Sequence, residues 1–262
     1  MDRILIELII LTGIIHIVDT LAYSVRLNSV KSGQVVLSFS LFNMVVLVSR
    51  TANTFQGPLI GKIVGYGLTH NIDPAGDLRF VIFAATGGTL LGILLIPTFL
   101  KVFQAAVKRL EEAGSVPSLV IEALQVNNIK RIVKSTVRPS RSMLQKLRYR
   151  EIPKRFLLIN IIVTGIYTIG VIAAQYSAVF VPAEDQLAAA AASGMVNGIA
   201  AILLTFFIDP KSAIVTDEAL RGKRPYGDVK ALVILLITTK LLGTLLGQVL
   251  FLPAAHMIAL FF

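Results

Sequence analysis

Long apolar runs are the feature of this sequence that most restricts its fold. Six runs are at least as long as the ~20 residues that an α-helix needs to cross the hydrocarbon core of a bilayer. They cover residues 4–25, 35–60, 80–100, 156–181, 187–208 and 231–251. Only 15% of the residues are charged, against about 25% in soluble domains. The sequence therefore predicts an all-α, polytopic membrane protein with six transmembrane helices.

The residue types that carry most enzyme chemistry are scarce. Cysteine is absent, which excludes disulfides, thiol nucleophiles and cysteine-based metal sites. The three histidines, His16, His70 and His256, do not have the spacing of metal ligands. Residues 57–63 resemble a phosphate-binding loop, but they are one residue short and lack its Ser or Thr. We therefore expect neither an enzyme nor a bound cofactor or metal.

Basic residues gather on alternate loops between the runs. The loops after the first, third and fifth runs hold 20 Lys and Arg residues, and the opposite side holds three. Cytoplasmic loops of membrane proteins are enriched in Lys and Arg. This asymmetry predicts a multi-pass membrane protein with both termini outside and the loop 101–155 in the cytoplasm. It also explains the net charge of +10, so we expect no nucleic-acid partner.

The basic segment 101–155 separates two apolar halves, residues 1–100 and 156–262. Residues 101–110 are expected to continue the third run as a helix. Residues 118–133 combine a broad apolar face with interleaved Lys and Arg. Such a pattern is typical of an amphipathic helix that lies on anionic membrane lipids. We therefore expect a three-helix repeat, a cytoplasmic amphipathic linker and a second three-helix repeat.

The two halves share short sequence matches in the same order. Residues 9–17 match residues 161–169 with six identities in nine, at an offset of 152. The stretch Gly-Thr-Leu-Leu-Gly occurs at 88–92 and again at 243–247. Because each half has three helices, a duplicated second half would cross the membrane in the opposite direction. We therefore expect a 3+3 inverted repeat, which is typical of transporters, with the substrate site between the halves near the membrane midplane.

A few polar residues lie inside the apolar runs, where each charge costs ~3 kcal/mol or more unless it faces water or a partner. The candidate substrate-binding residues are Arg50, Lys240, Asn43, Asn53 and Gln56. The candidate residues for charge pairing or proton coupling are Glu7, Asp19 and His16. Two cations among several amides form a pattern that suits an anionic headgroup.

The depth of these side chains follows from counting residues from the cytoplasmic end of each run. Lys240 comes out near the middle, His16 and Asn43 at a similar depth, and Asp19 slightly nearer the cytoplasm. Arg50 comes out at the level of Glu7, nearer the outside. Two interpretations of the charged residues stay open. In the first, Arg50 pairs with Glu7 and Lys240 pairs with Asp19 for structural reasons alone. In the second, these residues line a hydrophilic cavity in which an anionic substrate competes with the acids for the cations. His16 is either a packed residue of the helix bundle or a proton relay.

Two stretches resemble a known family. Residues 40–59 and 19–26 are similar to the Amj family, the alternate lipid II flippases of bacteria. The resemblance implies a protein of the bacterial cytoplasmic membrane whose cargo is lipid II, an undecaprenyl pyrophosphate that bears the cell-wall disaccharide-peptide. The flippase moves this lipid from the inner to the outer leaflet. An inside-negative membrane potential favours outward movement of such an anion without ATP. The resemblance assigns no individual residue to the site.

Two other functions stay open on the sequence alone. One is a membrane-embedded enzyme that acts on polyprenyl phosphates, which would need a reactive cluster near one membrane interface. The other is a non-catalytic membrane partner of a cell-wall complex, for which the buried cations would be dispensable. A homodimer also stays open, because six helices make a narrow bundle for so large a headgroup.

Overall fold

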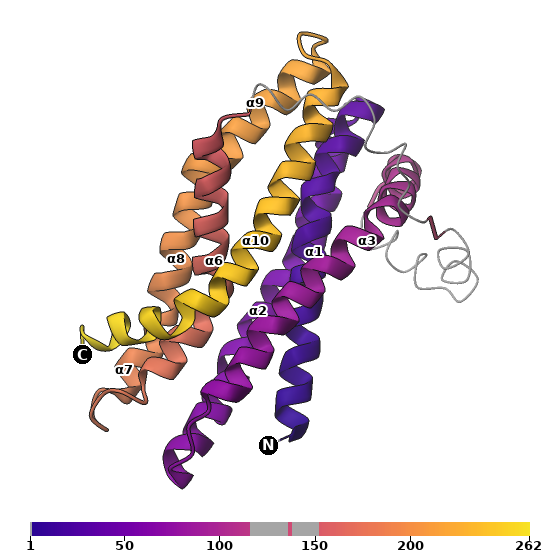
Figure 1. The fold of residues 1–262 in the computed structure, drawn as a ribbon. Helices are drawn as coiled ribbons and strands as arrows, with labels where there is room; N and C mark the ends of the chain where they lie inside the picture. Colours follow the sequence, from indigo (N-terminus) through magenta and orange to yellow (C-terminus); the bar gives the residue numbers. More distant parts are fainter. Residues whose placement is uncertain (1, 116–135, 138–151) are drawn as a thin grey trace.

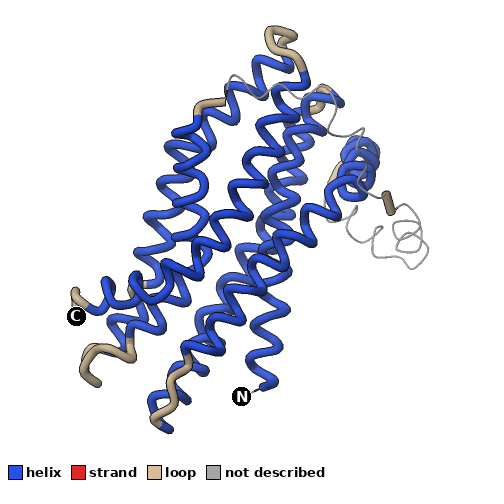
Figure 2. The backbone as a smooth tube through the Cα atoms, viewed as in Figure 1, coloured by secondary structure: helices blue, strands red, loops and turns tan. Residues whose placement is uncertain are grey.

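The computed structural model describes residues 2–115, 136–137 and 152–262. Within these ranges Figure 2 shows helices joined by loops, and no strand occurs among the described residues. Six helical segments are long and apolar enough to cross a membrane, which confirms the all-α prediction with six spans. The elements are α1 (Asp2–Ser32), α2 (Val35–His70), α3 (Ala75–Ala113), α6 (Lys154–Ser177), α7 (Gln186–Ala191), α8 (Ser193–Leu203), the π-helix η2 (Leu204–Ile208), α9 (Asp209–Leu220) and α10 (Tyr226–Ala259).

The spans run alternately up and down through one bundle (Figure 1). The first half consists of α1, α2 and α3. The second half consists of α6, a composite fifth span built from α7, α8, η2 and α9, and α10. The N- and C-termini lie near the same end of the bundle, and the end of α1 and the start of α10 lie at the other end (Figure 1).

Proline and glycine mark several helix ends. Pro74, Pro153 and Pro225 directly precede α3, α6 and α10. Proline is tolerated at a helix start because the first N–H groups have no intrahelical partner. Gly33 and Gly114 end α1 and α3 with φ of 72° and 66°, a left-handed conformation that glycine adopts without steric cost.

The helices extend beyond the apolar runs from which they were predicted. α1 continues past residue 25 to Ser32, and α2 continues past residue 60 to His70. α3 continues to Ala113, which confirms the helix expected over residues 101–110. The length of an apolar run corresponds to the thickness of the hydrocarbon layer. The helices end at turns outside this layer, so they are longer than the apolar runs. The amphipathic helix expected over residues 118–133 lies outside the described residues.

The first and third helices of each half pack closely: α1 against α3, and α6 against α10. Gly88 of α3 lies against the backbone of Gly13 in α1, with no room for a Cβ. Gly243 of α10 lies in the same way against the Ile161 carbonyl and the Thr164 side chain of α6. Small residues permit such close approach of transmembrane helices. The sequence stretches that match between the halves therefore form the helix contacts within each half.

Two apolar clusters join the halves at the two ends of the bundle. Towards the termini, Leu8 and Ile60 of the first half pack in one cluster with Phe251 of the second. At the opposite end, Leu27 of α1 packs in a second cluster with Leu232 of α10. The polar residues of the spans lie between these two apolar clusters.

Gly88→Ala tests the close approach of α1 and α3. A Cβ at residue 88 would collide with the backbone of Gly13, so we expect the free energy of unfolding in detergent to fall by about 1–3 kcal/mol. The matched control is Gly87→Ala, because a Cβ at residue 87 meets no atom within 4 Å and only helix propensity changes. Equal stability of the two variants would contradict this packing.

Candidate functional site

Four charged or phenolic side chains from both halves gather in the middle of the bundle. We name Asp19, Arg50, Tyr167 and Lys240 the charged cluster; they come from α1, α2, α6 and α10. The Asp19 carboxylate lies within electrostatic range of the Lys240 ammonium. Both Asp19 and Arg50 lie within electrostatic range of the Tyr167 hydroxyl. The charged cluster therefore connects two helices of the first half with two helices of the second.

Hydrogen bonds place the acid and the buried cation of the cluster. Ser49 Oγ donates to Asp19 Oδ1 over 2.7 Å, which links α2 to α1. Lys240 is buried, and its Nζ donates to the His16 carbonyl oxygen over 3.4 Å and lies 5.9 Å from the centroid of the Tyr23 ring. A buried ammonium needs such partners because burial of an uncompensated charge is costly. The expected pairing of Lys240 with Asp19 is thus an electrostatic attraction at longer range and not a direct ion pair.

Arg50 is placed differently from Lys240. It is exposed, and within the described chain it forms no hydrogen bond or ion pair through its side chain. Asn53, three residues further along α2, lines a cavity together with Val171 of α6, so Arg50 lies on the side of α2 that faces α6. A guanidinium presents five N–H donors in a planar fork that matches two oxygens of a phosphate or carboxylate. Arg50 is therefore the member of the cluster whose donors no side chain or carbonyl of the described chain uses.

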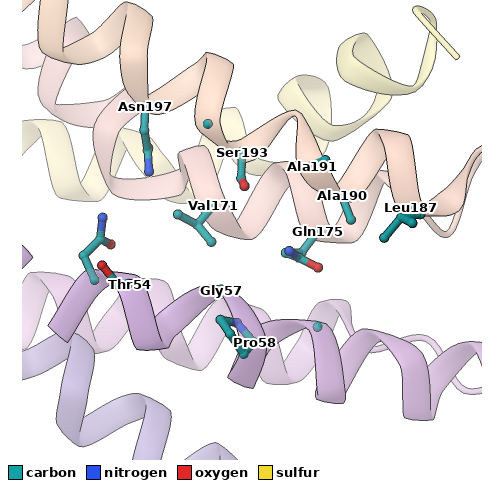
Figure 3. A pocket seen from close by; sticks show the side chains of 13 residues that line it. Thr54, Gly57, Pro58, Val171, Gln175, Leu187, Ala190, Ala191, Ser193 and Asn197 are labelled. Carbon is teal, nitrogen blue, oxygen red and sulfur yellow. The ribbon is translucent and has the colours of Figure 1, made fainter. Parts of the chain in front are cut away.

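A groove of about 510 Å³ adjoins the charged cluster, between α2 of the first half and α6, α7 and α8 of the second (Figure 3). Asn53 lies three residues beyond Arg50 on α2, and Val171 lies four residues beyond Tyr167 on α6. Both walls therefore begin about one helical turn from the charged cluster. We name this cavity the amide groove. Its lining residues, none of them charged, are Asn53, Thr54, Gly57, Pro58, Gly61, Val171, Gln175, Leu187, Ala190, Ala191, Ser193, Gly194 and Asn197.

The structure brings five of the predicted site residues to the charged cluster and the amide groove. Arg50, Lys240 and Asp19 belong to the cluster. His16 is buried beside it, and its carbonyl oxygen accepts the hydrogen bond from Lys240, so the two lie at the same depth as expected. Asn53 lines the groove.

The other predicted site residues lie apart. Gln56 is buried and donates from Nε2 to Thr12 Oγ1 over 2.7 Å, which links α2 to α1. Asn43 is exposed about two helical turns before Arg50 on α2. Because Ser49 pairs with Asp19, Asn43 lies nearer the predicted cytoplasmic end than His16, and its expected common depth with His16 is wrong. Glu7 pairs with Arg3 of its own helix, with 2.9 Å between Oε1 and Nε. These three predicted residues therefore belong neither to the charged cluster nor to the amide groove.

The depth expected for Arg50 is corrected by the register of α1 and α2. The hydrogen bond from Ser49 to Asp19 places Arg50 at the level of Asp19, and not at the level of Glu7. The count of depth assumed that the first span ends at residue 25, but α1 continues to Ser32. Counted from the predicted cytoplasmic end, each residue of α1 therefore lies about two helical turns further from that end than expected, whereas the count for α2 is unchanged. The expected pair of Arg50 and Glu7 is therefore not formed.

Several neutral residues of the site were missed by sequence reasoning. Tyr167, Gln175 and Asn197 lie in apolar runs, where a neutral polar side chain has no clear meaning before the helix faces are known. One signal was available for Tyr167, which takes the place of Ile15 in the match between residues 9–17 and 161–169. The match therefore sets a polar residue of the second half against an apolar residue of the first.

These features define a multi-pass α-helical membrane protein with an ionic cluster and a polar groove between its two halves. The family model of Amj, described as "Alternate to MurJ", matches residues 11–262, and the chain belongs to this family. The chain is 38% identical over 248 residues to the lipid II flippase Amj of Bacillus subtilis (strain 168), covering 94% of this chain and 92% of that protein. No solved structure matches the chain. The resemblance carried by residues 19–26 and 40–59 is therefore confirmed.

Cysteine pairs test the register of α1 and α2, since the chain has no cysteine of its own. Thr12→Cys with Gln56→Cys should be joined by a short bifunctional thiol cross-linker, because the end of the Gln56 side chain reaches Thr12 at 2.7 Å. Glu7→Cys with Arg50→Cys should not be joined by the same reagent, because the two positions lie at different levels. Mobility of the treated protein on a gel distinguishes the two pairs. Cross-linking of the second pair alone would restore the alignment expected from the apolar runs.

Proposed function

We propose that this chain is a lipid II flippase, which moves the undecaprenyl-pyrophosphate-linked peptidoglycan precursor from the inner to the outer leaflet of the bacterial cytoplasmic membrane. The observation that carries the proposal is Arg50, an exposed guanidinium in a spanning helix whose donors are unused within the described chain. The 38% identity to a protein named for this activity supports it. That relative is a transporter and not a catalyst, in agreement with the expectation that this chain is not an enzyme.

The charged cluster has the chemistry to hold a pyrophosphate. Arg50 can donate to two phosphate oxygens at once, which makes the strongest type of hydrogen bond to an oxyanion. Lys240 supplies a second cation nearby, and Asp19 is the counter-ion while no substrate is bound. A pyrophosphate that enters takes over this role, because it carries more negative charge than one carboxylate. The lipid chain stays in the bilayer, beside the apolar side chains that cover the outside of the bundle.

We further propose that the halves form a 3+3 inverted repeat, and matched contacts between the halves support this. At one end, Tyr226 Oη at the start of α10 donates to the Leu27 carbonyl oxygen of α1 over 3.4 Å. At the other end, Tyr176 Oη of α6 donates to Asp73 Oδ1, just before α3, over 2.8 Å. Each contact joins the first helix of one half to the start of the third helix of the other. Breaking one contact at a time would open the site to one side of the membrane at a time.

The proposed orientation has both termini outside and the linker 101–155 in the cytoplasm between the repeats 1–100 and 156–262. It rests on the distribution of Lys and Arg along the loops. The loop between α9 and α10, with Arg221, Lys223 and Arg224, lies at the end of the bundle away from the termini (Figure 1). Basic loops at this end would contact anionic membrane lipids. The homodimer stays a prediction.

Complementation of cells depleted of their main lipid II flippase tests the role of Arg50. The wild-type chain should restore growth. Arg50→Gln at equal membrane abundance should lower transport at least about tenfold, because hydrogen bonds to charged groups contribute about 1.5–3 kcal/mol each. The matched control is Lys62→Gln, which removes an exposed cation further along α2 and should rescue fully.

Full rescue by Arg50→Gln would contradict the proposed site. Full rescue by Lys240→Met as well would show that the cations are dispensable, as the interpretation of a non-catalytic membrane partner requires. Membrane abundance must be measured for every variant, because Lys240 is buried and its replacement leaves Asp19 without its counter-charge.

Purified protein in liposomes tests the driving force. We expect lipid II to move between leaflets without any nucleotide, because no nucleotide-binding motif is present in the sequence. A potential that is negative on the donor side should accelerate the movement, since it contributes ~2.3 kcal/mol per charge per 100 mV. A rate that does not respond to the imposed potential would contradict this drive.

A further inference from the structure

We propose that the amide groove is the subsite for the uncharged sugar part of the lipid-linked headgroup, and that it adjoins the pyrophosphate subsite at Arg50. This inference rests on the proposed flippase function and adds a second, neutral subsite to the cationic one.

The chemistry of the groove lining favours a neutral ligand with many hydroxyls. Its polar side chains are three amides and two hydroxyls, and no charged residue lines it within the described chain. An amide offers both a donor and an acceptor, and so does a hydroxyl. Sugar hydroxyls also donate and accept, whereas a phosphate only accepts and is best met by cations. The polar lining residues are Asn53, Thr54, Gln175, Ser193 and Asn197.

Most of these polar groups are available to a ligand. Within the described chain, the side chains of Asn53, Gln175 and Ser193 form no hydrogen bond to protein. Asn197 packs its Oδ1 against Gly170, where that atom is buried without a partner, and Figure 3 shows its amide nitrogen turned towards α2. Asn53, Gln175 and Ser193 are half-buried, so their unused donors and acceptors on facing walls can bind a polar molecule. A buried polar atom such as Asn197 Oδ1 is normally paired.

The position and the size of the groove agree with the order of groups in the headgroup. The groove begins about one helical turn, ~5.4 Å, from Arg50 and Tyr167. In lipid II the sugar is attached directly to the pyrophosphate, so a phosphate at Arg50 places the first sugar at the mouth of the groove. The volume of about 510 Å³ lies within the ~300–1,000 Å³ that is usual for small-ligand sites.

The two walls of the groove belong to different halves. Asn53 and Thr54 come from α2, and Gln175, Ser193 and Asn197 come from α6 and α8. A sugar in the groove would therefore bridge the halves. The nearby side chains of Phe55, Leu187 and Met195 are apolar and exposed, so the groove opens beside a surface that lipid covers. The polyprenyl chain can remain in the bilayer while the sugar occupies the groove.

Two pairs of variants test the groove, each with a matched control. Gly194→Leu fills the groove, because residue 194 lines it and a Cβ there meets no atom within 4 Å. Gly198→Leu is its control: residue 198 lies one turn further on α8, is equally open, and does not line the groove. Thr54→Val removes a lining hydroxyl, and Thr51→Val is its control outside the groove. Both threonine hydroxyls donate to the carbonyl oxygen four residues earlier, at 3.1 and 2.8 Å.

The measurement is binding of two probes to the purified full-length protein: lipid II, and undecaprenyl pyrophosphate without sugar or peptide. Gly194→Leu should weaken lipid II binding about tenfold, as expected for the loss of a few neutral hydrogen bonds, and leave the bare pyrophosphate lipid unchanged. Thr54→Val should act in the same direction by a smaller factor. Both control variants should bind both probes like the wild type. Arg50→Gln should weaken binding of both probes.

The outcomes separate the two proposals. If Gly194→Leu weakens both probes equally, or weakens neither, the groove is not a sugar subsite, although the flippase function is untouched. If the wild-type protein binds neither probe, the proposed function itself is wrong and this inference falls with it. Normal yield and helix content of Gly194→Leu, checked by circular dichroism, exclude misfolding as the cause of a loss.

Discussion

Attraction between Asp19 and the buried ammonium of Lys240 is the interaction on which the rest of the arrangement depends. A cation inside a membrane bundle is costly unless a counter-charge or water lies nearby. Lys240 is carried by α10 and buried, and its counter-charge comes from α1 of the other half. Ser49 binds the same carboxylate and so fixes α2 beside α1. The neighbouring Arg50 is thereby held on the side of α2 that faces the second half, where its donors are unused.

In the proposed function the same charges serve both structure and transport. Asp19 neutralises the cations while the site is empty, and an entering phosphate takes its place. The apolar clusters at both ends of the bundle join the halves above and below this layer. The amide groove then provides neutral hydrogen-bonding groups directly beside the charges. The polar layer is therefore divided between a cationic part and a neutral part, as the proposed pyrophosphate and sugar subsites require.

Sequence patterns predicted the parts of the fold that depend on hydrophobicity alone. The apolar runs identified all six spans, and the common depth of His16 and Lys240 was correct. The level of Arg50 was not, because a helix can continue beyond the hydrocarbon layer and hydropathy does not report where it ends. Gln175 and Asn197 could not be predicted, since the direction of a neutral amide within an apolar run depends on which helix packs against it. The break between α7 and α8, which shapes the groove wall, has no strong sequence signal either.

The central claim is that water reaches the polar layer between the halves. Labelling of single-cysteine variants in intact cells with a membrane-impermeant maleimide tests it most directly, because a thiol reacts as a thiolate and needs water to ionise. Thr54→Cys lies in the amide groove, and Leu91→Cys lies at a similar depth on the exposed apolar face of α3. We predict rapid labelling of Thr54→Cys and none of Leu91→Cys. Equal labelling of the two variants, or no labelling of Thr54→Cys in a folded protein, would contradict a water-filled cleft.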